Sequence, residues 1–93
     1  MNAKAKGSRS ERKTRDLLLS EGYYVTKAGG SFGLWDLIAL NPSGTLVVQV
    51  KTNHGPGREE KAKLKNWARK FPLVSCWIAI VRDRKTTLWD ELR

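Results

Sequence analysis

This 93-residue sequence has few of the residues that mark several common kinds of protein. It contains one cysteine, Cys76, and one histidine, His54. No apolar run approaches the roughly 18 residues that a transmembrane helix needs, and the polar N-terminus predicts no signal peptide. A single cysteine cannot form an internal disulfide. We therefore expect Cys76 to be a buried thiol in a protein of the reducing cytoplasm. We interpret His54 as a loop residue.

Acidic residues are also scarce, with 9 Asp and Glu against 18 Lys and Arg, which gives a formal net charge of +9. So basic a short chain indicates a polyanionic partner, and nucleic acid is the leading candidate. A membrane surface is less favoured because the basic residues alternate with the pattern of a globular core. The length predicts one domain over residues 1–93, with residues 1–7 as a basic flexible arm.

The hydrophobic pattern predicts an α/β fold of order αβββαββ, with a single sheet on which the helices pack. Leu64, Trp67, Ala68 and Phe71 recur at helical spacing and predict the buried stripe of the second helix. The expected helices cover residues 8–21 and 58–71, and the expected strands cover residues 23–27, 34–40, 45–51, 74–81 and 86–89.

The end of the 45–51 strand carries the clearest chemical signal. Val47, Gln49 and Lys51 alternate onto one side of that strand, and Asp36 lies on the preceding strand. An acid, an amide and a lysine gathered there are typical of a metal-dependent phosphodiesterase, because carboxylate and amide oxygens suit Mg²⁺. Three plainer interpretations stay open. Asp36 can be a turn residue, Lys51 can extend to solvent, and Gln49 can mark a site that binds DNA without cutting it.

Two further residues are candidates for the same site. Glu11 follows Ser8 as in a capping box, yet it shares a helix face with Leu18 and could reach the metal directly or through water. Ser31 lies in the glycine-rich turn of residues 28–33, where it either shapes the turn or holds a phosphate. The basic residues expected to contact DNA phosphates are Lys6, Arg9, Arg12, Lys13, Arg15 and Lys27.

Together these segments resemble the PD-(D/E)XK nuclease superfamily, and most closely the archaeal-type Holliday junction resolvases, which phages also carry. The matching segments are residues 7–12, 30–33, 36–39 and 48–51. The resemblance implies a restriction-endonuclease-like core, in which two helices flank a central mixed β-sheet. It also implies a Mg²⁺- or Mn²⁺-dependent endodeoxyribonuclease. It would act in a prokaryotic cytoplasm or, for a phage protein, in that of the host.

The resemblance also implies roles for individual residues. Glu11, Asp36 and Gln49 would hold the metal, Lys51 would assist the attacking water, and Ser31 would lie beside the scissile phosphate. Gln49 stands where the family usually has an acid, which predicts that Gln49→Glu keeps or raises activity.

The same resemblance implies a homodimer that makes paired nicks in a four-way junction. Trp35 and Trp89 are the predicted apolar patch for a partner copy. The alternatives are a nuclease of the same fold acting on flaps, ends or mismatches, and a catalytically silent DNA-binding module.

Overall fold

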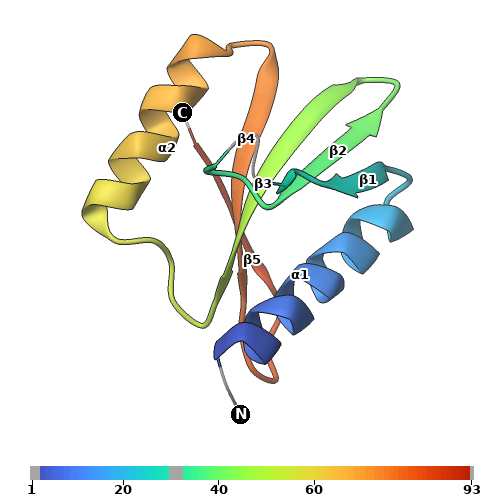
Figure 1. Cartoon of the computed structure of the whole chain (residues 1–93). Coiled ribbons are helices and arrows are strands. Elements are labelled where there is room, and N and C mark those ends of the chain that lie inside the picture. Colours follow the sequence, from blue (N-terminus) through green and yellow to red (C-terminus); the bar gives the residue numbers. More distant parts are fainter. Residues whose placement is uncertain (1–2, 30–32, 93) are drawn as a thin grey trace.

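The computed structural model describes residues 3–29 and 33–92, with side chains from residue 7 onward. The predicted element order αβββαββ is confirmed (Figure 1). The helices are α1 (Ala3–Ser20) and α2 (Arg58–Lys70), and the strands are β1 (Tyr24–Lys27), β2 (Leu37–Asn41), β3 (Gly44–Thr52), β4 (Val74–Val81) and β5 (Leu88–Glu91). Over the described ranges, no helix is both long and apolar enough to cross a membrane.

The strands form one mixed sheet in the order β1-β2-β3-β4-β5. β3 and β4 are parallel, whereas the other neighbouring pairs are antiparallel. A parallel pair needs a crossover connection, and α2 provides it between β3 and β4. β3 therefore lies at the centre of the sheet, with its final residues next to the loop that leads into α2.

The two helices cover opposite faces of the sheet (Figure 1). On the α1 face, Leu18 packs in a cluster with Val48 and Ala79, while on the α2 face Leu64 packs in a cluster with Val47. Val47 and Val48 point to opposite faces because side chains alternate along a strand. The alternation places Gln49 and Lys51 on the α2 face, together with Val47 as the sequence predicts.

The first helix begins earlier than predicted. α1 starts at Ala3, so residues 3–7 belong to a helix where the sequence analysis expected a flexible arm, and Ser8 lies inside the helix instead of capping it. Ala3, Lys4 and Ala5 explain the difference, since alanine and lysine are strong helix formers. The second strand begins later, at Leu37, which leaves Asp36 just before it.

The prediction for Trp35 was wrong. Its side chain is 3% exposed and packs edge-on against Trp67 of α2, with ring centroids 5.3 Å apart. Phe71 was predicted to lie in the buried stripe of the second helix, but it is 44% exposed. It follows the end of α2 and stacks on Trp67. Trp89 is 37% exposed, as expected for a patch residue. Cys76 is a buried thiol, as predicted.

Candidate active site

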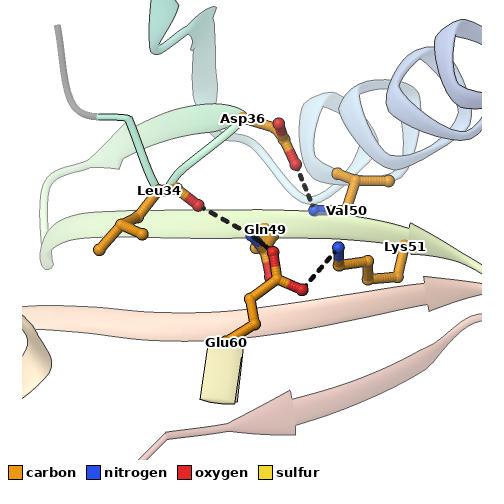
Figure 2. Close-up of polar contacts among 6 residues, drawn as sticks. All are labelled: Leu34, Asp36, Gln49, Val50, Lys51 and Glu60. Atoms are coloured by element: carbon orange, nitrogen blue, oxygen red, sulfur yellow. Dashed lines mark hydrogen bonds and ion pairs between the residues drawn. The ribbon is translucent and has the colours of Figure 1, made fainter. Parts of the chain in front are cut away.

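Asp36 is held at the point where β2 and β3 separate. The paired register ends at Leu37 and Val48, and the backbone N–H of Asp36 still donates to the Val48 carbonyl at 2.9 Å. Beyond this point β2 no longer pairs with β3. The backbone N–H of Val50 donates instead to Oδ2 of the Asp36 side chain at 2.7 Å (Figure 2). A carboxylate thus takes the place of a strand partner at the end of β3.

The surroundings of Asp36 make its ionised form costly. Burial raises the pKa of this carboxyl group above its ordinary value of 3.8. The hydrogen bond from Val50 and the positive charge of Lys51 lower the pKa, but the negative charge of Glu60 raises it again, and the net shift is upward. A cation beside Asp36 would relieve this cost, which is the electrostatic setting of a metal ligand.

Gln49 is 7% exposed and its amide orientation is well defined. Nε2 donates to the Leu34 carbonyl at 3.1 Å and to Oε2 of Glu60 at 3.2 Å. Turning the amide over would set its oxygen against two other oxygens, so this orientation is favoured. Oε1 is buried and has no hydrogen-bond partner among the described residues. Buried polar atoms are seldom left unpaired, and this oxygen is therefore suited to a bound cation or water.

Lys51 lies beside Gln49 and forms an ion pair with Glu60, with Nζ 2.8 Å from Oε1 (Figure 2). Glu60 belongs to the first turn of α2, and the sequence analysis missed it. Its signal in the sequence is an acidic pair, Glu59 and Glu60, that opens a helix otherwise rich in lysine and arginine. Only the crossover geometry brings one of these two acids back to the end of β3.

Glu11 lies on α1, away from the contacts that join Gln49, Lys51 and Glu60. It lines a pocket of about 210 Å³ with Lys27 and Leu37, the residue after Asp36. No hydrogen bond or ion pair joins Glu11 to Asp36 among the residues that the structure describes. Within those same ranges, no group of three or more His, Cys, Asp and Glu side chains is placed to hold a metal ion. A ligand role for Glu11 stays a prediction, and Ser31 lies outside the described residues.

Basic residues line two pockets, one on either side of α1. The pocket that contains Glu11 is also lined by Arg12, Arg15 and Lys27. A second pocket, of about 520 Å³, is lined by Arg9 and Lys13. The side chain of Lys6 lies outside the described residues. The hydroxyl groups of Ser10 and Thr52, 2.6 Å apart, fix α1 against the end of β3. This contact holds the part of α1 that carries Arg9, Arg12, Lys13 and Arg15 against the end of β3.

A mixed sheet lies between two helices, and Asp36, Gln49 and Lys51 gather where β2 and β3 part, as the resemblance to the PD-(D/E)XK nucleases predicts. The sequence model described as archaeal Holliday junction resolvase (Hjc) matches residues 2–92. The chain belongs to this family, and it is a structure-selective, junction-resolving nuclease.

Two further comparisons accompany this match. The structure resembles Hjc of Archaeoglobus fulgidus, a Holliday junction resolvase from an archaeal hyperthermophile, with a TM-score of 0.77. The two sequences are 24% identical, and the match covers 94% of this chain and 73% of that one. At this identity the likeness establishes the fold. No match was found among curated proteins.

Proposed function

We propose that this chain resolves four-way DNA junctions by metal-dependent hydrolysis, with paired nicks made by a homodimer. The observation that carries the proposal is the gathering of Asp36, Gln49 and Lys51 at the end of β3, within the fold of a resolvase family. Oxygen donors and an ammonium group at one strand end can bind a hard cation and a phosphate together.

The residues present fit a divalent cation. Asp36 has a pKa raised by burial, so its ionised form gains from a nearby positive charge. The buried Oε1 of Gln49 is an oxygen atom that can bind a cation, and it has no hydrogen-bond partner among the described residues. Mg²⁺ and Mn²⁺ both accept carboxylate and amide oxygens, and we propose Asp36 and Gln49 as ligands, with Glu11 directly or through water. Such a cation, when bound, activates water and offsets charge on phosphate oxygens.

Lys51 has a separate role in the proposal. Its side chain is 30% exposed and lies one residue before the end of β3, so its ammonium group can face both a water molecule and the DNA. It would orient the attacking water and offset the negative charge that develops on the scissile phosphate. Ser31 would donate a hydrogen bond to a phosphate oxygen near the site.

The dimer is proposed from the need for two opposed cuts. One small site can cut one strand at a time, whereas a twofold dimer presents two sites to two opposed strands. Trp89 lies on β5, an edge strand, and borders a pocket together with Leu17, Leu46 and Trp77. Both Leu17 and Trp89 are 37% exposed. An apolar pocket beside the edge strand of a sheet is suited to contact with a second copy of the chain.

Cleavage of three end-labelled substrates tests the proposed activity. A four-way junction, a fork and a linear duplex are incubated with Mg²⁺, with Mn²⁺ or with EDTA. We expect symmetric nicks in the junction, weak cleavage of the other two, and none in EDTA. Faster cutting of the fork or duplex would favour a nuclease for flaps or ends, while binding without cutting in either metal would favour a silent DNA-binding module.

A further inference from the structure

We infer that Glu60 supplies the second carboxylate of this metal site, in place of the acid that β3 lacks at Gln49. The metal-binding set is then divided between the β2–β3 strand end and the first turn of α2. This inference rests on the proposed metal-dependent function, and it adds a residue that lies outside the strand motif.

The contacts of Glu60 set it apart from its neighbour. Its Oε1 pairs with Lys51 and its Oε2 accepts from Gln49, so both carboxylate oxygens face the site (Figure 2). Glu59, one residue earlier in the same turn, is exposed. A helix dipole favours acids anywhere in the first turn, and this would account equally for Glu59 and Glu60. The dipole therefore leaves unexplained why Glu60 alone reaches the end of β3.

The charges around Glu60 are consistent with a cation site. Glu60 contacts Lys51 and Gln49, and Asp36 accepts from the N–H of Val50, so both carboxylates lie at the end of β3. Lys51 is the positive side chain that the structure places against this acid pair. Two carboxylates and one ammonium leave a net negative charge at the end of β3, where Gln49 also carries its partnerless Oε1. A divalent cation would balance that charge and give the amide oxygen a partner.

The same contacts explain why position 49 holds an amide. A glutamate there would set its carboxylate against the Leu34 carbonyl and the Glu60 carboxylate, which now accept hydrogen bonds from Nε2. Gln49 and Glu60 are thus a matched pair, in which the acid lies on the helix and the amide on the strand. The sequence-based expectation for Gln49→Glu is revised accordingly. Alone it should weaken metal binding and cleavage, because it places two like charges together.

Calorimetric titration of the metal-free protein with Mn²⁺ tests the inference without relying on activity. The variants are Glu60→Gln, the exchange variant Gln49→Glu/Glu60→Gln, and Glu59→Gln as a matched control of equal charge change. We expect Glu60→Gln to weaken Mn²⁺ binding by on the order of tenfold or more, since a charged ligand is lost. The exchange variant should recover most of that loss, and Glu59→Gln should bind like the natural chain. Circular dichroism and thermal unfolding check that each variant folds.

Junction cleavage by the same proteins separates this inference from the proposed function. If the natural chain binds Mn²⁺ through Glu60 but cuts no junction, the proposed function fails and the ligand assignment stands. If the natural chain cuts junctions, and Glu60→Gln binds Mn²⁺ and cuts equally well, the assignment of Glu60 as a ligand is overturned and the proposed function stands. Absence of Mn²⁺ binding by the natural chain overturns both. Failure of the exchange variant to recover Mn²⁺ binding, although folded, would reduce Glu60 to the ion-pair partner of Lys51 and overturn the assignment.

Discussion

At the scale of single residues, the half-buried carboxylate of Asp36 links stability to function. Burial raises its pKa, so the folded protein favours the protonated acid more than the unfolded chain does. The stability that this preference contributes is fully present below pH 3.8, the ordinary value, and is lost as the pH rises through the higher pKa of the folded state. At neutral pH the site therefore destabilises the metal-free fold, as expected of a group arranged for a ligand.

Asp36→Asn should reduce metal-dependent cleavage by on the order of a hundredfold or more while leaving DNA binding intact or tighter. The asparagine oxygen can still accept from the Val50 N–H, and the carboxylate that repels phosphate is gone. In metal-free buffer the variant should also melt at a higher temperature than the natural chain at pH 7, and this difference should shrink as the pH falls towards 3.8.

Asp16→Asn, at an exposed position on α1, is the matched control for both measurements. It should leave cleavage and the pH dependence of melting close to those of the natural chain. Near-normal cleavage by Asp36→Asn would exclude Asp36 as a ligand, and a lower melting temperature at pH 7 would contradict the cost assigned to its burial.

At the scale of helices and strands, local patterns predicted much of the fold. Alternation placed Val47, Gln49 and Lys51 on one face of β3, and the apolar run of residues 74–81 is β4 as predicted. Two of the misses depend on contacts between distant segments. Trp35 is buried because Trp67 of α2 covers it, and Glu60 reaches Lys51 because the crossover returns α2 to the end of β3. The residues next to Trp35 and Glu60 in the sequence do not predict these two contacts.

The basic residues of α1 should contribute directly to DNA affinity. If about six phosphates are neutralised, affinity should fall on the order of a thousandfold between 50 and 200 mM salt, because bound counterions are released. Replacing Arg12 and Arg15, which line the pocket beside Glu11, with alanine should lower the slope of log affinity against log salt by about 2. Fluorescence anisotropy with a labelled junction measures this slope.

Lys65→Ala/Lys70→Ala removes the same charge from exposed positions of α2 and serves as the control for the α1 variant. Because these lysines are not among the residues that line the pockets around α1, the control should change the slope less. An equal effect of the two double variants would mean that net charge, and not the α1 surface, determines binding. A junction affinity insensitive to salt would remove the case for phosphate contacts altogether.

At the scale of the whole molecule, the apolar pocket beside β5 predicts self-association. Sedimentation of the natural chain should show twice the 10.5 kDa mass of one chain at micromolar concentration. Leu17→Gln/Trp89→Gln should shift this species to the monomer, since it removes apolar contact area from the pocket rim. Leu73→Gln is the control, because Leu73 is 94% exposed in the turn between α2 and β4 and does not line this pocket.

A natural chain that sediments only at 10.5 kDa, with and without junction DNA, would refute the homodimer. Monomer formation by Leu73→Gln, with Leu17→Gln/Trp89→Gln still dimeric, would instead move the interface to the turn between α2 and β4. In either case the surface assigned to the second copy would be wrong.

Cleavage of a supercoiled plasmid that extrudes a cruciform tests the central claim most directly, because it requires a junction, a metal and two coupled cuts. A single nick relaxes the plasmid and the cruciform is reabsorbed, so the second cut must fall within the lifetime of one complex. With Mg²⁺ or Mn²⁺, the account predicts linear plasmid as the first product, little nicked circle, and no product in EDTA. Accumulation of nicked circle before any linear product, or uncut plasmid in both metals, would contradict it.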